Sequence, residues 1–213
     1  MELPDDDPLP DWANVVLAHA RPPLRDALSS LIRFDVRLAR IVSTASEPVL
    51  GQLRLAWWRE ELGKTWTENR PLPPDPLLAN LLSSWSNHMP ELQALVDGWE
   101  QLLDPAPWET SVREKFCAVH AGLFEALAAI AGAGNDVAKP GPHGHCWALV
   151  KLSAFGGVRS PLDAPKIDKL PPDLRSLSMI GGLSRRALKR GSAAIFGDRF
   201  SPLVALRLGI FGT

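Results

Sequence analysis

Apolar side chains recur every three or four residues along this chain, and proline interrupts the pattern at short intervals. The recurrence is clear over residues 24–42 and restarts after Pro48. This spacing places apolar side chains on one face of a helix, and no alternating strand pattern competes with it. Proline lacks an N–H and is tolerated mainly in the first helical turn, so many of the 20 prolines mark helix starts. The expected fold class is all-α.

The helix boundaries and the domain organisation follow from the same signals and from chain length. We expect helices over residues 11–20, 24–44, 48–68, 76–87, 90–103, 110–132, 143–156, 172–190 and 202–210. A chain of 213 residues with 46% hydrophobic and 22% charged residues is able to bury one sizeable core. We therefore expect a compact single domain over residues 1–213, with an acidic N-terminal tail at about residues 1–10.

Composition and charge exclude several classes of function. The chain has 0 tyrosines, which excludes tyrosine acid–base chemistry. Residues 166–213 are basic while the rest of the chain is acidic, and that acidity disfavours nucleic-acid binding. No apolar run reaches the length of a membrane-spanning helix. No secretion signal precedes the two cysteines, so we expect a cytoplasmic protein with both thiols reduced.

Residues 31–62 carry the most specific motif in the chain. The second half of this segment contains the run Arg54, Leu55, Ala56, Trp57, Trp58 and Arg59. The segment resembles the first helix pair of the squalene/phytoene synthase family, and residues 95–100 and 115–122 resemble two later family segments more weakly. The resemblance implies the isoprenoid-synthase fold, a compact helical bundle around a central cleft, here shortened at the C-terminus.

The chain departs from the family at the magnesium motifs. The first acidic motif of the family aligns with Arg37, Ala39, Arg40 and Ser43, and the second should lie within residues 145–157, which contain no Asp or Glu. Magnesium takes oxygen ligands and bridges carboxylates to substrate phosphates, and arginine cannot ligate it. We therefore expect no magnesium-dependent prenyl transfer and no cofactor.

Within the family, the segment most resembles the non-catalytic branch typified by the mitochondrial complex I assembly factor. That resemblance implies a protein that binds a protein partner or an isoprenoid-type lipid, with assembly of respiratory complex I as its setting. The alternative is an active prenyl-diphosphate transferase that uses magnesium and has its acids elsewhere, for example at Asp97 and Glu100.

Eight residues are candidates for ligand binding on this alignment. They are Arg37, Arg40, Arg54, Trp57, Trp58, Arg59, Asp97 and Glu100. Guanidinium groups suit anionic head groups, whereas a surface ladder with a cation–π pair between Arg54 and Trp58 is the competing interpretation. Solvated faces are the competing interpretation for the other charged candidates.

Cysteine and histidine offer a weaker alternative site. Cys117 and His120, together with His143, His145 and Cys146, supply nitrogen and sulfur ligands of the kind that zinc prefers. Their spacing matches no standard structural zinc motif, and buried packing explains them. We expect no metal here.

A basic cluster near the C-terminus suggests a membrane surface. It consists of Arg185, Arg186, Lys189 and Arg190, and the apolar stretch 200–211 follows it. This order suits contact with an anionic membrane, which would make the protein peripheral to the inner face of that membrane, as a scaffold. A core helix that follows a solvated face explains the pattern equally well.

Overall fold

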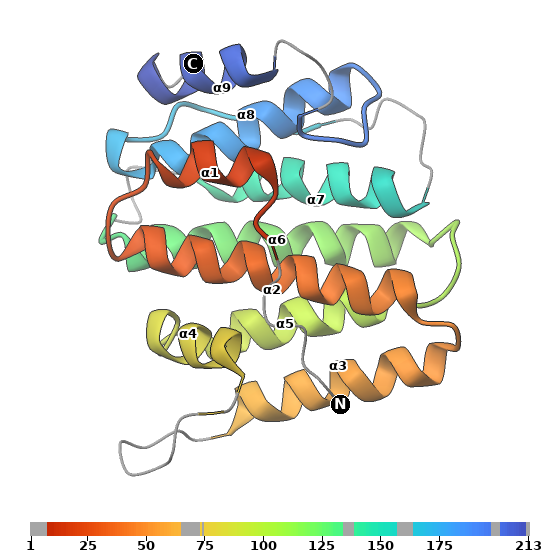
Figure 1. The fold of residues 1–213 in the computed structure, drawn as a ribbon. Coiled ribbons are helices and arrows are strands. Elements are labelled where there is room, and N and C mark those ends of the chain that lie inside the picture. The colour runs from red at the N-terminus through yellow and green to blue at the C-terminus, as the bar shows by residue number, and fades with distance from the viewer. Residues whose placement is uncertain are drawn as a thin grey trace.

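The computed structural model describes residues 8–64, 73, 75–133, 139–156, 164–196 and 201–211, and this part of the chain is helical without strands (Figure 1). Its elements are α1 (Asp11–Leu17), α2 (Leu24–Thr44), α3 (Pro48–Gly63), α4 (Pro76–Ser84), α5 (Met89–Glu100), α6 (Thr110–Ile130), α7 (Gly141–Gly156), the short 3-10 helix η1 (Pro172–Leu174), α8 (Arg175–Lys189) and α9 (Ser201–Phe211). The all-α prediction is confirmed.

The predicted helices are all present, and the proline signals are confirmed at α3 and α4. Asp75 caps α4, because its Oδ1 accepts hydrogen bonds from the backbone N–H of Leu77 at 2.8 Å and of Leu78 at 3.1 Å. Several helices end earlier than predicted. At α4 the reason is tertiary: Trp85 is fully buried and donates from its indole to the carbonyl of Ala27 at 3.0 Å, which ends the helix at Ser84.

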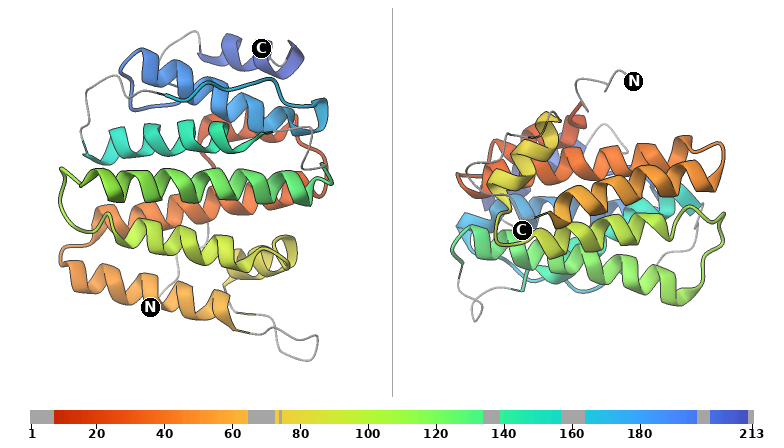
Figure 2. Two further views of the ribbon diagram at one scale, coloured as in Figure 1. Left: turned by 180° about the vertical axis from the view of Figure 1, so that it is seen from behind. Right: turned by 90° about the horizontal axis from the view of Figure 1, so that it is seen from below.

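The helices are stacked in successive layers from α3 at one end of the molecule to α9 at the other (Figure 1). The views from behind and from below show the long helices running roughly along one common direction (Figure 2). α2 packs against α4, α5 and α6, and α7 lies between α6 and α8. α2 and α7 therefore both reach the middle of the stack, although they are far apart in the sequence.

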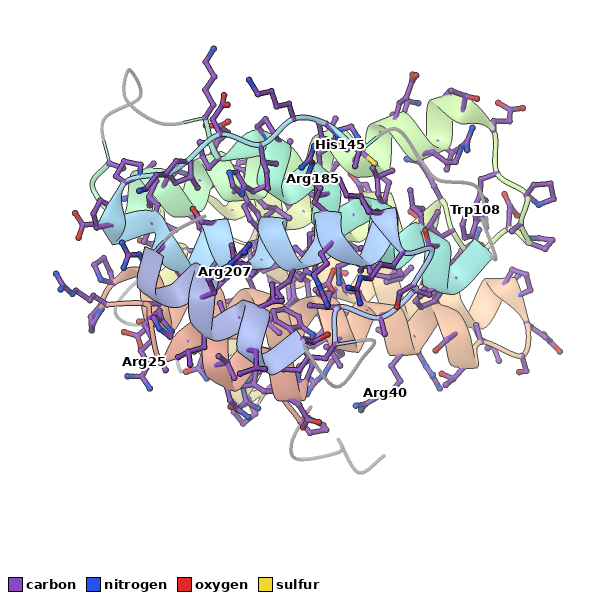
Figure 3. All side chains as sticks on the ribbon, turned by 90° about the horizontal axis from the view of Figure 1, so that it is seen from above. Arg25, Arg40, Trp108, His145, Arg185 and Arg207 are labelled. Atoms are coloured by element: carbon purple, nitrogen blue, oxygen red, sulfur yellow. The ribbon has the colours of Figure 1, made fainter. Side chains whose placement is uncertain are left out.

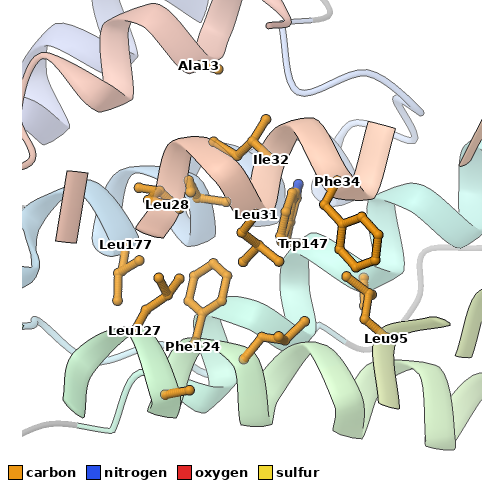
Figure 4. Close-up of a cluster of buried hydrophobic side chains, with 14 of the residues drawn as sticks. Ala13, Leu28, Leu31, Ile32, Phe34, Leu95, Phe124, Leu127, Trp147 and Leu177 are labelled. Atoms are coloured by element: carbon orange, nitrogen blue, oxygen red, sulfur yellow. The ribbon is translucent and has the colours of Figure 1, made fainter. Parts of the chain in front are cut away.

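A cluster of buried apolar side chains lies where α2, α6, α7 and α8 meet (Figure 4). Leu31 of α2, Phe124 of α6 and Trp147 of α7 are almost completely buried there, and the rings of Phe124 and Trp147 lie 5.9 Å apart. Each such side chain stabilises the fold by about 2 kcal/mol relative to an exposed position. The closeness of α6 and α7 depends on Gly144, since a Cβ atom there would lie 2.2 Å from the backbone oxygen of His120.

Candidate functional site

A cavity of about 380 Å³ opens beside α2 and α7. Most of its described wall is apolar and aromatic, with side chains that include Trp12, Ile32, Val36, Trp99, Trp147 and Phe155. The charged residues of this wall are Asp11, Asp35 and Lys151. Cavities of this size and character are typical binding sites for small apolar molecules.

Asp35 lies on the buried face of α2, next to Phe34 and one turn from Leu31 and Leu38. It is 1% exposed, and a buried carboxylate is costly unless an opposite charge or hydrogen-bond donors replace its lost hydration. Lys151 of α7 supplies the opposite charge, and its Nζ donates a hydrogen bond to Oδ2 of Asp35. The same ammonium lies 4.0 Å from the ring centroid of Trp147, so a cation–π contact also holds it.

The other carboxylate oxygen of Asp35 faces two rings. The indole N–H of Trp99 donates to Oδ1 at 3.1 Å, and Nε2 of His120 lies 3.5 Å from the same atom. His120 is fully buried, and its Nδ1 donates to the backbone oxygen of Phe116 at 2.9 Å. Burial favours the neutral acid, but Lys151 and His120 outweigh burial and hold the pKa of Asp35 below its ordinary value. Asp35 is therefore ionised at neutral pH.

These residues do not fit a magnesium ion. A magnesium site bridging a diphosphate needs several carboxylate oxygens, whereas Asp35 is a single carboxylate that already pairs with an ammonium. In the part of the chain that the structure describes, no three or more His, Cys, Asp or Glu side chains form a group that could hold a metal ion. Lys151 stands on α7, the helix on which the sequence alignment expects the second acidic motif.

Arg37, predicted as a ligand-binding residue, takes part in a structural ion pair. Its Nη1 lies 2.6 Å from Oδ2 of Asp75, the cap of α4, and its guanidinium lies 5.7 Å from the ring centroid of Trp58. The Arg37 side chain is 14% exposed, so the interpretation of a solvated face does not describe it. Arg40 is half-buried and extends away from the bundle (Figure 3).

The other predicted residues lie around α3 and α5. Nε of Arg59 lies 2.6 Å from Oδ1 of Asp97, and its Nη2 donates to Glu100, so both predicted acids pair with one arginine. Trp58 is 3% exposed and packs against Phe34 at 4.9 Å between ring centroids.

Arg54 and Trp57 point to the surface, where Trp57 is 41% exposed. The described residues that line the cavity include none of the eight predicted ligand-binding residues. Their binding role stays a prediction.

The cysteines and histidines are held by packing and by local hydrogen bonds. Burial raises the pKa of both Cys117 and Cys146 to about 12, which keeps the two thiols protonated and poorly suited to bind a metal. Nε2 of His143 donates to the backbone oxygen of Asp168 at 2.9 Å. Burial lowers the pKa of His143, so its ring is neutral at pH 7.

The basic cluster is only partly at the surface. Lys189 and Arg190 are exposed, whereas Arg185 and Arg186 are half-buried and Arg186 donates to Ser201 at 3.3 Å. Arg185 also lies on a different part of the molecule from Arg40 (Figure 3). No helix among the described residues is long and apolar enough to cross a membrane. Contact with an anionic membrane surface stays a prediction.

Asp35 and Lys151, the two charged residues inside the cavity, are missing from the predicted site. Both have a local sequence signal that could have found them. Asp35 lies at the spacing of the buried leucines of α2, and Lys151 interrupts the apolar run Ala148 to Leu152. A single charge on an apolar helix face requires a buried partner, so two such charges are candidates to pair.

The model of the squalene/phytoene synthase family matches residues 14–133, which is more than half of the chain. This range contains Asp35 and the helices α2 to α6, whereas Lys151 lies beyond it. No curated protein matches the chain, and no solved structure matches it.

Proposed function

The chain belongs to the squalene/phytoene synthase family, and from this premise we propose that it is a non-catalytic member that binds an isoprenoid-type lipid in the cavity between α2 and α7. The observation that carries the proposal is the ion pair between Asp35 and Lys151. Family chemistry needs a metal-bridged diphosphate in such a cavity, and here an ammonium already neutralises the carboxylate that faces it.

The cavity walls support retention of a lipid without catalysis. Trp99, Trp147 and Phe155 present large apolar surfaces, which favour burial of a branched hydrocarbon chain. A metal ion at this point would have to displace Lys151 from Asp35 or approach its ammonium at close range. Two positive charges at such a distance repel each other by several kcal/mol at an effective dielectric constant of about 20.

The test is calorimetric titration of farnesol, farnesyl diphosphate and geranylgeranyl diphosphate into the full chain, with and without magnesium, with an assay for released diphosphate. Binding that does not depend on magnesium, without release of diphosphate, supports the proposal. Magnesium-dependent binding with release would restore the active prenyl-diphosphate transferase. Failure of all isoprenoid ligands to bind would remove the lipid from the proposal.

A second candidate function, binding of a protein partner in respiratory complex I assembly, is favoured by the outer face of α3. Val49, Leu50, Leu53 and Trp57 follow one another at helical spacing and are 41% to 63% exposed. α3 lies at the end of the stack, and none of the described helices covers its outer face (Figure 1). Exposed apolar stripes of this kind often mark protein interfaces.

The matched substitutions Leu53→Asp and Leu203→Asp test this second candidate. Both leucines are 63% exposed, but Leu203 lies on α9 at the opposite end of the molecule. In the source organism, with the chromosomal gene replaced by each variant, Leu53→Asp should lower the amount of assembled complex I while Leu203→Asp should not. Equal amounts of complex I in the two strains would rule out a role of α3 in complex I assembly.

A further inference from the structure

The charges on the cavity wall limit the head group that the cavity accepts. Asp11, at the exposed rim, and Asp35 are negative, and Lys151 is positive, so the charged residues of the described wall sum to one negative charge. A diphosphate carries several negative charges and loses much of its hydration on entering an apolar cavity. Because the wall offers no net positive charge in return, an anionic head group is unfavourable here.

The ammonium of Lys151 still has a donor to offer to a ligand. Of its three N–H groups, one donates to Asp35, and the ammonium also lies over the ring of Trp147. Among the described residues, Nζ has this one hydrogen-bond acceptor. Lys151 lines the cavity and its side chain is 15% exposed, so an N–H remains available to an oxygen atom inside it.

Asp35 balances the positive charge of Lys151, and both of its carboxylate oxygens already accept hydrogen bonds from the protein. Oδ1 accepts from Trp99 and Oδ2 from Lys151, and the residue is 1% exposed. A ligand therefore meets a hydrogen-bond donor whose positive charge is balanced. A protonated amine is also disfavoured beside Nζ of Lys151, because it has no lone pair with which to accept a hydrogen bond from the ammonium.

We infer that the cavity selects an isoprenoid-type molecule with an uncharged oxygen head group, a hydroxyl or a carbonyl, that accepts a hydrogen bond from Nζ of Lys151. The inference rests on the proposed function, since it assumes that the cavity holds an isoprenoid-type chain. It names the head group that the family relationship alone does not give. An uncharged oxygen leaves the ion pair intact and loses little hydration on entry.

The test uses four probes that share one hydrocarbon tail: farnesol, farnesyl diphosphate, farnesylamine and the hydrocarbon farnesene. Each is titrated calorimetrically into the full chain without magnesium. Farnesol should bind tightest and exceed farnesene by about tenfold, the value of one hydrogen bond to a charged donor. Tighter binding of the diphosphate or of the amine overturns the inference and leaves the lipid-binding function in place. Binding of none of the four overturns the proposed function itself.

Two variants test whether Asp35 and Lys151 select the head group or only support the structure. Asp35→Asn keeps an acceptor for Trp99 but removes the negative charge, so the ratio of diphosphate to farnesol affinity should rise by about tenfold or more. Lys151→Met removes the donor, so farnesol and farnesene should then bind alike. The matched control Asp173→Asn, at a carboxylate that is 72% exposed, should leave the order of affinities unchanged.

The variants also give a clear negative result. If Asp35→Asn lowers the affinity for all four probes by the same factor, Asp35 only supports the structure and the inference fails. If Asp35→Asn does not fold, the order of affinities in the unaltered protein and in Lys151→Met decides. A preference for farnesol over farnesene that persists in Lys151→Met overturns the inference.

Discussion

Lys151 of α7 and Asp35 of α2 form an ion pair across 116 residues of sequence, in the wall of the cavity. The pair joins α2 to α7 where these helices line both the core and the cavity. It combines a structural role, which is to compensate a buried carboxylate, with a chemical one, which is to present a donor to the cavity. The two roles predict different results for single and double substitutions.

Lys151→Met should destabilise the protein by about 3 to 5 kcal/mol, because it leaves the carboxylate of Asp35 buried without its ammonium. The double variant Asp35→Asn/Lys151→Met should recover most of this loss, since the asparagine oxygen still accepts from Trp99 and no unpaired charge remains. Urea unfolding of the two single variants and the double variant measures the coupling. A double variant as unstable as the sum of the two single variants would contradict the ion pair.

Arg37 and Arg59 should differ in their contribution to stability, although each pairs with carboxylates on another helix. The partner of Arg37, Asp75, has a side chain that is 2% exposed, so Arg37→Met should cost about 2 to 3 kcal/mol. Arg59 is 35% exposed and its partner Asp97 is 53% exposed, so solvent screens the pair and Arg59→Met should cost about 1 kcal/mol or less. Thermal and urea unfolding of both variants gives the comparison, and equal losses would contradict it.

Most of the fold could be predicted from the sequence, whereas for the candidate site the sequence carries a signal for each buried charge but none for their pairing. α2 has the predicted bounds, because residues 24–44 have a clear apolar period and a proline boundary. The cavity depends on Asp35 of α2 meeting Lys151 of α7, and local periodicity carries no information on which distant helices become neighbours. The family motif points instead to Trp58 and Arg59, which the structure uses to join α3 to the rest of the bundle.

Two glycines on neighbouring helices should respond oppositely to alanine. Gly144→Ala places a Cβ atom 2.2 Å from the backbone oxygen of His120, so α6 and α7 must separate and the protein should lose about 2 to 3 kcal/mol. Gly122→Ala on α6 meets nothing within 4 Å and should stabilise the helix by up to about 1 kcal/mol. Circular dichroism during thermal unfolding measures both variants. A neutral Gly144→Ala would contradict the close approach of the two helices.

His143 should make the protein less stable as the pH falls from about 7 to about 5, and His143→Gln should remove part of this dependence. Burial lowers the pKa of the folded ring below its ordinary value of 6.5, against the smaller opposing effect of the Asp168 carbonyl. The unfolded chain therefore takes up a proton in this range while the folded ring does not, so the free energy of unfolding decreases with falling pH. A proton on Nδ1 would find no acceptor among the described residues, because Gly181 packs directly against that atom.

Glutamine keeps a donor for the Asp168 carbonyl but does not titrate, so the difference between His143→Gln and the unaltered protein isolates this one group. The unaltered protein should lose more stability than His143→Gln between about pH 7 and about pH 5, measured by urea unfolding. His145→Gln is the control: burial lowers the pKa of that ring too, but His145 is only half-buried, so its effect should be smaller.

Asp35 acts in a separate range, because a lowered carboxyl pKa gives stability that is lost only as the pH falls below about 4. Parallel stability curves for the unaltered protein and His143→Gln above about pH 5 would show that His143 is not held neutral by its surroundings.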